Sequence, residues 1–333
     1  DVESQITAVT EKGLDPRNFI LCTDDCHSGT LVNDGHMNRV VRHAIDCGCD
    51  PLIAIQMATI NTACHFGMER ELGSITPGRR ADFIVTSSID DLPIDVVFAG
   101  GERVAENGKL LTKCPHYEWP QTVRKTVNLG KKLERKDFMI SAPIGLSSVK
   151  AKVIGVIENQ APTKALEFNL PVEQGNVQLE ADVCYLSLVE RHRGTGAVVN
   201  GFVSGFGYTE SMAIASSVAH DSHHMIVVGT NQEMMASAAN RLGEVGGGVS
   251  LWKDGSEVAL VELPIAGLMS DSNASEVADK AQAIVSAMID CGCTLNNAYM
   301  QHTLLALVVI PELRISDLGL VDVNRFELTN IIE

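Results

Sequence analysis

Two adjacent carboxylates follow an apolar, strand-like segment near the start of the chain. The segment covers residues 18–23, and Asp24 and Asp25 come directly after it, ahead of a loop rich in Ser, Gly, Asn and Asp. A carboxylate at the end of a buried strand can bind a metal, act as a general base or do both, because desolvation and a nearby cation shift its pKa in opposite directions. Aspartates in this position also commonly cap the following turn. The residues alone leave both interpretations open, and Asp24 is the first candidate for chemistry.

The elements that follow the two carboxylates read as a loop and two helices. A helix is expected over about residues 35–47, ending at Gly48, because Gly readily takes the left-handed conformation of a helix C-terminus. Asp50 and Pro51 predict the next helix, as N-cap and first helical residue, and its apolar pattern continues to residue 63. This order resembles the last unit of a parallel β/α barrel, in which the C-terminal ends of the strands carry the catalytic residues.

Changes in sequence character predict four regions in an α/β protein. Residues 1–66 are expected to be the C-terminal end of a TIM-like (β/α)8 barrel. Residues 67–120 contain short strands joined by Pro-Gly, Gly-Gly and Asn-Gly turns, which predict a small β domain. Residues 121–137 are polar and rich in Lys, Arg and Glu, which is typical of a linker. Residues 138–333 are expected to form a layered α/β domain.

Local signals place two helices and a hairpin in the last region. Residues 230–233 and 273–276 each resemble a capping box and predict helix starts, and the two helices are expected to end at glycines, over residues 246–248 and at Gly292. Between the helices, Asp254-Gly255 separates two apolar segments and predicts a tight hairpin turn.

The pentapeptide Ile-Asp-Cys-Gly-Cys occurs twice, at residues 45–49 and 289–293. A repeat or a thiolate metal site is one interpretation. A two-cysteine cluster lacks the further ligands that structural zinc requires, and Gly is the residue that most often ends a helix. We therefore interpret both copies as helix C-termini.

Composition excludes several classes of function. The 333 residues are 45% hydrophobic and 20% charged, with a formal net charge of −16, as in an ordinary globular protein. Nucleic-acid binding depends on clustered Lys and Arg, which this acidic chain lacks. The longest apolar stretch, near residues 304–310, is too short to span a membrane, and no signal sequence is visible. Nine scattered cysteines are typical of reduced thiols, so we expect a cytoplasmic protein with neither a nucleic-acid nor a membrane partner.

Residues 73–85, with the sequence GSITPGRRADFIV, resemble a phrase of the amidohydrolase superfamily. In that superfamily the phrase marks where the chain leaves the barrel and returns to a small β-sandwich. Further segments along nearly the whole chain are similar to the bacterial adenine deaminases of this superfamily: residues 21–25, 35–42, 54–61, 216–223, 227–231 and 263–271.

This resemblance implies hydrolytic deamination of adenine to hypoxanthine and ammonia, a reaction of purine salvage. It also implies a binuclear divalent metal centre of Mn, Fe or Zn, with Mn favoured, and a homo-oligomer. Family members supply metal ligands from an H-x-H pair on the first barrel strand, a bridging acid and two further histidines, none of which can be placed here. The chain also begins at Asp1 without a methionine. We therefore expect a C-terminal portion that is inactive by itself and needs the N-terminal half of the same enzyme.

The resemblance assigns roles to the residues of the first region. Deamination adds water at C6 of adenine and expels ammonia, so the site needs an activated hydroxide and a group that carries the proton. Asp24 is expected to be both metal ligand and proton carrier. Asp25 is expected to organise the loop or to hydrogen-bond a metal-binding side chain and so hold it in place. His27 can orient the substrate, although an exposed loop histidine is the simpler interpretation.

A second polar cluster consists of His220, Asp221, Ser222, His223 and His224. These side chains can hydrogen-bond the ring nitrogens of a purine, so we expect His220, Asp221, Ser222 and His223 to belong to a loop that closes over the substrate. Two alternatives are a polar turn capped by Asp and Ser, and an additional metal site. The spacing of His220 and His223 suits one metal only if the loop is helical.

Two other functions remain open on the residues alone. The superfamily also hydrolyses cyclic amides such as hydantoins, and the phrase at residues 73–85 does not distinguish these substrates. A chain without most metal ligands can also be a binding or assembly module without catalysis. The other zinc deaminase design, H-x-E with P-C-x-x-C, does not occur in this sequence, and Cys114-Pro115-His116 does not supply it.

Overall fold

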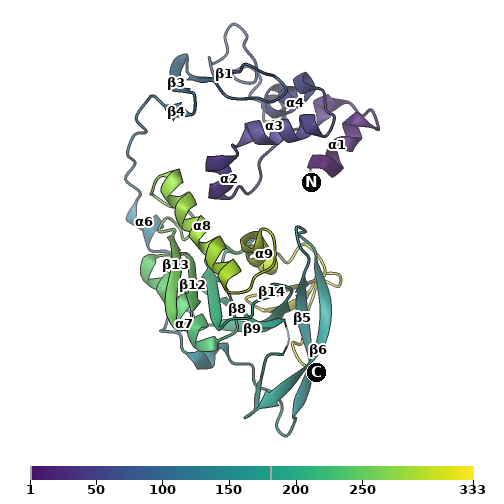
Figure 1. Ribbon diagram of the computed structural model, residues 1–333, viewed down its shortest axis with the longest axis vertical. Coiled ribbons are helices and arrows are strands. Elements are labelled where there is room, and N and C mark those ends of the chain that lie inside the picture. Colours follow the sequence, from purple (N-terminus) through teal and green to yellow (C-terminus); the bar gives the residue numbers. More distant parts are fainter. Residues whose placement is uncertain (1, 181) are drawn as a thin grey trace. The chain divides into compact units, whose positions relative to one another are not determined.

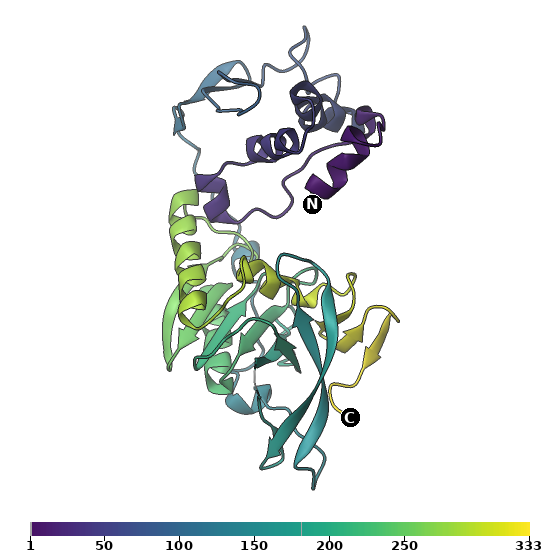
Figure 2. The same cartoon turned by 45° about the vertical axis from the view of Figure 1, so that its right-hand side comes forward.

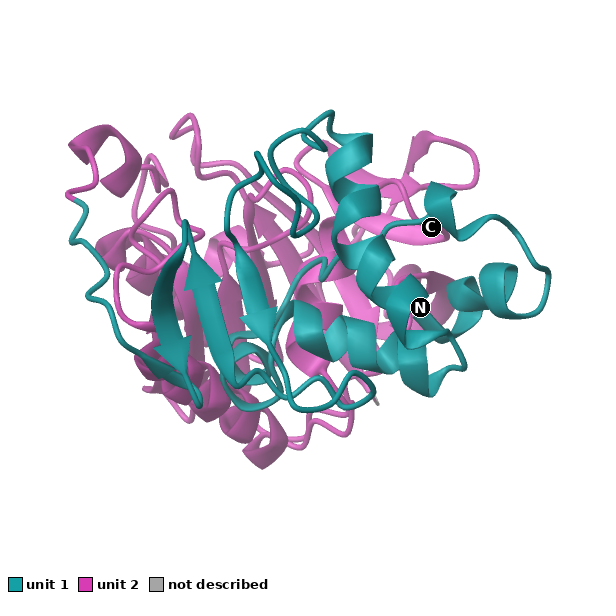
Figure 3. Cartoon of the chain, turned by 90° about the horizontal axis from the view of Figure 1, so that it is seen from above, with its two compact units in different colours: residues 1–117 teal, residues 118–333 magenta. Residues whose placement is uncertain are grey.

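The computed structural model describes residues 2–180 and 182–333 (Figure 1). Contacts within the chain divide it into two compact units, unit 1 with residues 1–117 and unit 2 with residues 118–333, which are coloured separately in Figure 3. The division therefore falls close to the predicted boundary between residues 120 and 121.

Unit 1 begins with short helices. They are α1 (Val2–Thr10), η1 (Pro16–Asn18), α2 (Ser28–Asn33), α3 (Met37–Asp46), α4 (Pro51–Ala58) and α5 (Ile60–His65). The predicted start of α4 is confirmed, because the Asp50 carboxylate accepts hydrogen bonds from the backbone N–H groups of Leu52 and Ile53, and Pro51 is the first helical residue. The apolar faces of α1, α3 and α4 meet in a small core that includes Ile6, Val41 and Met57.

The second predicted helix is interrupted at Thr59. This residue has φ −130° and ψ −93°, and α5 begins only at Ile60. The Thr59 hydroxyl donates to the carbonyl of Ile55 at 2.6 Å. A threonine that bonds the preceding turn in this way competes with the helix backbone, which accounts for the break.

The predicted strand over residues 18–23 is wrong for this chain. Residues 19–23 are not assigned to a strand and pair with no other strand of the described residues. Two hydrogen bonds join them to α4 and α5, from the backbone N–H of Leu21 to the carbonyl of Met57 at 3.2 Å and from Asn61 Nδ2 to the carbonyl of Phe19 at 3.0 Å. A strand exists only with a neighbour to pair with, and the described part of unit 1 offers none here.

The β region of unit 1 is one antiparallel sheet. Its strands are β1 (Phe83–Val85), β2 (Val96–Ala99), β3 (Glu102–Glu106) and β4 (Lys109–Leu110), in that order. The predicted turns at Gly100-Gly101 and Asn107-Gly108 are confirmed, since all four residues have positive φ. Within the described residues of unit 1 no second sheet covers this one, so the expected β-sandwich is present only as a single sheet.

Unit 2 is built on a nine-stranded mixed sheet (Figures 1 and 2). The order is β13 (Ser256–Glu262), β12 (Gly248–Lys253), β10 (Met212–Ser216), β11 (Met225–Gly229), β8 (Val183–Val189), β9 (Val198–Ser204), β5 (Ser148–Val156), β6 (Thr163–Glu173) and β7 (Asn176–Val177). Only the β5–β9 pair is parallel among the strand pairs of the described residues. A smaller antiparallel sheet follows, made of β14 (Leu313–Ser316), β15 (Gly319–Asp322) and β16 (Glu327–Thr329).

The two faces of the large sheet are covered by different helices. On one face, α7 (Gln232–Val245) packs against alternate strand residues such as Tyr185 and Val227. On the other, α8 (Ala274–Asp290), α9 (Ala298–Thr303), η3 (Leu304–Ala306) and the small sheet pack against the opposite set, which includes Leu186. The predicted layered α/β domain is therefore observed, because period-two alternation of buried strands directs one set of side chains to each layer.

The predicted linker over residues 121–137 is instead part of unit 2. It contains α6 (Gln121–Arg124) and runs into η2 (Arg135–Phe138). Leu129 and Leu133 are buried in the core beside α7. The backbone N–H and carbonyl of Leu133 both bond the side chain of Asn240 on α7, at 2.9 Å each. Residues 121–137 are polar in composition because most of their side chains lie on the outer face, while the spaced leucines face α7.

Local signals in unit 2 are confirmed with one shift of register. The side chains of Asn231 and Asn273 cap α7 and α8. Thr230 is not the cap, because its hydroxyl bonds the backbone of Glu210 and Met212 instead. Asp254 and Gly255 have positive φ and form the predicted hairpin turn between β12 and β13.

Both copies of the pentapeptide end a helix, as predicted. Gly48 and Gly292 have φ of 90° and 97°. In each copy the second cysteine donates its backbone N–H to the carbonyl five residues earlier, from Cys49 to Ala44 and from Cys293 to Met288, at 3.0 Å. This is the hydrogen bond of a Schellman helix end. All nine cysteines are free.

No helix of the described residues combines the length and apolar character needed to cross a bilayer.

Candidate functional site

Asp24 ends the extended segment of unit 1 in a turn. Its φ is 51°, a left-handed value that Asp tolerates better than most residues. One carboxylate oxygen accepts the backbone N–H of Asp25 at 2.9 Å, and both side chains are exposed. Asp24 also lines a cavity of about 450 Å³ together with Arg39 and His43 of α3. The Asp24 carboxylate is therefore accessible from a cavity that the basic side chain of Arg39 and the titratable side chain of His43 also line.

His27 is the N-cap of α2. Its Nδ1 accepts the backbone N–H of Gly29 at 3.2 Å. Burial lowers the pKa of His27, which favours the neutral ring that this bond requires. The proton of the neutral ring then lies on Nε2. The structure thus gives Nδ1 of His27 a structural role, whatever the ring contacts through its other edge.

The described residues do not by themselves form the expected metal centre. Nowhere in residues 2–180 and 182–333 do three His, Cys, Asp or Glu side chains gather closely enough to hold a metal. Asp24 offers one carboxylate, whereas protein metal sites take three or more ligands. The donor set of this chain therefore does not fit a complete metal site.

The histidine loop, residues 219–224, connects β10 to β11 in unit 2. It is a turn and not a helix, so the spacing of His220 and His223 does not align them on one helical face. The backbone N–H of His223 donates to the carbonyl of Ala219 at 2.7 Å, and His223 Nδ1 accepts the N–H of Ala219 at 3.2 Å. The rings of His220 and His223 meet edge to face at 5.2 Å. The predicted polar side chains thus belong to a closed, internally bonded turn.

Two residues that sequence analysis did not single out hold this turn from the end of β8. Arg191 is 1% exposed and donates from Nε to the carbonyl of His223 at 2.5 Å. Its other nitrogens reach the carbonyl of Ala266 at 3.2 and 3.3 Å. His192 Nε2 lies 2.9 Å from the carbonyl of Ser222. Burial lowers the pKa of Arg191 to about 10, so it stays protonated at neutral pH.

Glu190, beside these two residues, closes the loop between β8 and β9. Its carboxylate accepts the backbone N–H groups of His192, Arg193 and Thr195 at 2.5, 2.7 and 3.0 Å, and the Thr195 hydroxyl at 3.0 Å. Burial alone would raise the pKa of Glu190, but these hydrogen bonds outweigh it and hold the pKa at about 2. A single glutamate before the loop gave no signal of this role.

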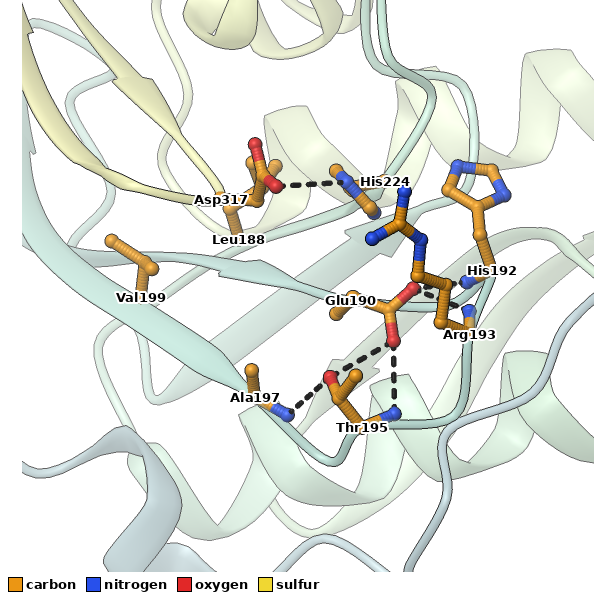
Figure 4. Close-up of a pocket in the computed structure, with 9 residues that line it drawn as sticks. All are labelled: Leu188, Glu190, His192, Arg193, Thr195, Ala197, Val199, His224 and Asp317. Carbon is orange, nitrogen blue, oxygen red and sulfur yellow. Dashed lines mark hydrogen bonds and ion pairs between the residues drawn. The ribbon is translucent and has the colours of Figure 1, made fainter.

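A pocket lies beside this loop in unit 2 (Figure 4). We call it the β8–β9 pocket. Its lining is Leu188, Glu190, His192, Arg193, Thr195, Ala197, Val199, His224 and Asp317. Of the predicted cluster at residues 220–224, it is His224 that lines this pocket.

The structure describes the predicted site residues in two separate groups. Asp24, Asp25 and His27 belong to unit 1, and the histidine loop belongs to unit 2. Within each group the residues are close in sequence, so they lie near one another in any fold of the chain.

Comparisons with known proteins cover both units. The family model of the adenine deaminase C-terminal domain matches residues 160–327, and that of the amidohydrolase family matches residues 2–104. Curated relatives named adenine deaminase include those of Ruegeria pomeroyi and Roseobacter denitrificans, each 72% identical over 100% of this chain and 56% of the relative. The relative from Moorella thermoacetica is 43% identical over the same shares.

The chain therefore spans just over half the length of the curated relatives it matches. Among solved structures, an amidohydrolase from Thermotoga maritima aligns with 32% of this chain and 35% of its own, at 21% identity and a TM-score of 0.20, too low to establish a common fold. Half of the chain matches the first family model, and the conclusion is that this chain belongs to the adenine deaminase C-terminal domain family.

Proposed function

We propose that this chain is the C-terminal part of an enzyme that hydrolyses adenine to hypoxanthine and ammonia. One observation carries the proposal: relatives named adenine deaminase match the entire chain at up to 72% identity. The matched segment includes both Asp24 and the histidine loop. The hydantoin-hydrolysing alternative has no such support, because the match extends through unit 2 and not only through the amidohydrolase region.

Asp24 is proposed to take a proton from the attacking water and return it to the leaving ammonia. Its exposed carboxylate borders a cavity, so a water and a substrate can reach it. Asp25 is proposed to organise the loop through its backbone N–H, which bonds the Asp24 carboxylate and fixes the orientation of that group. His27 is proposed to position substrate through its Nε2 edge, since Nδ1 is engaged with Gly29.

Asp24 is also proposed to be a ligand of a divalent, binuclear metal centre, with Mn favoured. A bound divalent metal lowers the pKa of water towards neutrality. Since the described residues do not complete such a site, the remaining ligands are proposed to come from the part of the relatives that this chain does not span. Metal analysis of the protein extended to that length tests the metal's identity.

The histidine loop is proposed to contact the purine through His220, Asp221, Ser222 and His223. Arg191 and His192 support this role, because they fix the backbone of the loop by bonding the carbonyls of His223 and Ser222. Substituting His220→Asn in the extended protein is expected to raise KM for adenine while largely preserving kcat. An unchanged KM would remove the loop from the substrate site.

The deaminase proposal is tested by ammonia release from adenine. The 333-residue chain and a protein extended to the length of the relatives are compared, each with added Mn²⁺. We expect turnover by the extended protein and none by this chain. Substituting Asp24→Asn in the extended protein is expected to reduce kcat by about a thousandfold, because general acid–base catalysis contributes about 10²–10⁴-fold.

Three results would contradict this proposal in different ways. Turnover of hydantoin but not adenine favours a cyclic-amide hydrolase. Absence of any turnover by the metal-loaded extended protein favours a binding or assembly module. Substantial activity of the Asp24→Asn variant removes the proposed role of Asp24. Cell fractionation and size-exclusion chromatography of the extended protein test the proposed cytoplasmic location and homo-oligomer.

A further inference from the structure

The β8–β9 pocket has one apolar side and one charged side. Leu188, Ala197 and Val199 form the apolar side, and Arg193 and Asp317 contribute opposite charges (Figure 4). The cavity measures about 350 Å³, which falls within the range of small-molecule sites. The residues come from the end of β8, the following loop, β9 and the turn between β14 and β15, so the pocket depends on the finished fold of unit 2.

Glu190 is not the group that awaits a ligand. Its two carboxylate oxygens already accept four hydrogen bonds from the loop over residues 192–195. The same bonds occupy the loop's backbone N–H groups, which would otherwise be a binding site for an external anion. Recognition in this pocket therefore depends on side chains and not on the loop backbone.

Asp317 and Arg193 make no ion pair with each other within the described residues. The Asp317 carboxylate lies 3.7 Å from His224 Nε2, an ion-pair distance but too long for a hydrogen bond, and its side chain is 47% exposed. Burial lowers the pKa of His224, which favours the neutral ring and so weakens this pair. The guanidinium of Arg193 makes no hydrogen bond or ion pair with the described residues. Opposite charges that line one pocket without pairing with each other can each bond a different edge of the same ligand.

Two imidazoles also line the pocket, with their ring planes tilted by 53° to each other. The rings of His192 and His224 lie 4.7 Å apart, and His224 is 8% exposed. Within the described part of the chain, Nδ1 of His224 is buried and has no hydrogen-bond partner. A buried polar atom in that state is costly, and a ligand that let the ring shift would relieve it.

We propose that the β8–β9 pocket binds a purine base, with a donor N–H on the Asp317 carboxylate, a ring nitrogen or carbonyl accepting from Arg193, and the ring face against the apolar side. A purine carries donors and acceptors on separate edges of one flat ring, which matches separate charges on a partly apolar wall. The choice of purine among flat heterocycles rests on the proposed function, whereas the requirement for both a donor and an acceptor rests on the pocket alone.

Calorimetric titration of the 333-residue chain with adenine and with hypoxanthine tests this proposal. We expect binding of one molecule per chain. Asp317→Asn is expected to weaken binding about tenfold, because it removes a charged hydrogen-bond acceptor. Ala197→Phe is expected to abolish binding by filling the apolar side. Asp279→Asn, on the exposed face of α8, is the matched control and should bind as the unchanged chain does.

Further titrations separate the possible sources of a signal. Benzoate offers only acceptors, benzamidine only donors, and leucine both charges without an aromatic ring, and each is expected to bind at least tenfold more weakly than adenine. No purine binding, equal binding of leucine, or binding that survives both Asp317→Asn and Ala197→Phe would overturn the proposal. Circular dichroism and melting of each variant establish that the loss is not a loss of fold.

Asp24→Asn separates this proposal from the proposed function. If adenine binding to the chain falls with Asp24→Asn and not with Asp317→Asn, the signal belongs to unit 1 and the pocket proposal fails. If the extended protein releases no ammonia from adenine while this chain still binds adenine through Asp317, the deaminase proposal fails and the pocket proposal stands.

Discussion

Residues 19–23 in unit 1 and β8 in unit 2 are both apolar segments followed by a carboxylate, but their structures differ. β8 pairs with β9 on one side and with β11 on the other, and all of its residues are buried. The segment at residues 19–23 pairs with no strand of the described residues and has exposed positions such as Ile20. The carboxylate of Glu190, after β8, accepts four hydrogen bonds. Within the described residues, the carboxylate of Asp24 accepts one, from the backbone N–H of Asp25.

This comparison shows what a strand-like sequence does and does not determine. Alternation and β-branched residues make a segment suitable for a pleated, buried surface, but the neighbours decide whether the surface forms. A carboxylate after a paired strand is held by the loop that the strand positions. A carboxylate after an unpaired segment remains accessible, as the catalytic role proposed for Asp24 requires.

The largest expected difference between the two segments is in leucine truncation. Leu186 in β8 is fully buried, so Leu186→Ala should lower the free energy of unfolding of unit 2 by about 3–4 kcal/mol through lost contacts and a cavity. Leu21 is half-buried, so Leu21→Ala should cost unit 1 about 1 kcal/mol. Urea unfolding followed by hydrogen exchange at amides of each unit measures both changes. Equal losses would mean that residues 19–23 are as firmly packed as β8.

The two pentapeptide helix ends give the next largest difference. Both glycines have left-handed φ, which costs an alanine about 1–2 kcal/mol. A Cβ on Gly48 would have nothing within 4 Å, but a Cβ on Gly292 would lie 2.5 Å from the Thr209 hydroxyl and 2.9 Å from its backbone nitrogen. Gly292→Ala should therefore cost about 3 kcal/mol and Gly48→Ala about 1 kcal/mol. The same unfolding measurement compares them, and similar costs would show that the tighter surroundings of Gly292 relax freely.

Short-range features were predictable from sequence because they depend on a few consecutive residues. The caps at Asp50 and Asn273, the Asp254-Gly255 turn and both pentapeptide ends are of this kind. The break at Thr59 was not, because the same hydroxyl can face solvent or bond the preceding turn. The absence of a strand at residues 19–23 depends on neighbours, which no local pattern reports.

The β8–β9 pocket was not predictable for a related reason. Its charged and aromatic residues, His192, Arg193, His224 and Asp317, span 126 positions of the chain, and their meeting depends on the order of strands in the sheet. The histidine loop was found because its residues are consecutive, but the side chains that hold it, Arg191 and His192, belong to a different strand connection. The sequence thus identified the residues of the histidine loop and missed Arg191 and His192, which bond the backbone of that loop.

The two carboxylates give the smallest stability losses of the three pairs, and one of these losses depends on pH. The pKa of Glu190 is about 2 in the folded chain, below its ordinary value of 4.5. A lowered pKa means that Glu190 stabilises the fold at every pH above 4.5 and that this contribution declines as the pH falls towards 2. Glu190→Gln should cost about 2 kcal/mol at pH 7, because the amide keeps one acceptor and turns a donor towards Thr195.

Thermal unfolding from pH 7 to pH 3 measures the Glu190 effect, with Asp24→Asn as the matched variant in unit 1. The gap between the unchanged chain and Glu190→Gln should narrow below pH 4.5, because protonation removes the same charge that the substitution removes. Asp24→Asn should leave the midpoint at pH 7 unchanged, since the hydrogen bond that its carboxylate accepts from the backbone of Asp25 survives in asparagine. A gap that persists at pH 3 would mean that Glu190 acts through packing and not through its charge. A large loss for Asp24→Asn would mean that Asp24 holds its loop as Glu190 does, which would weaken the case for a carboxylate kept accessible for catalysis.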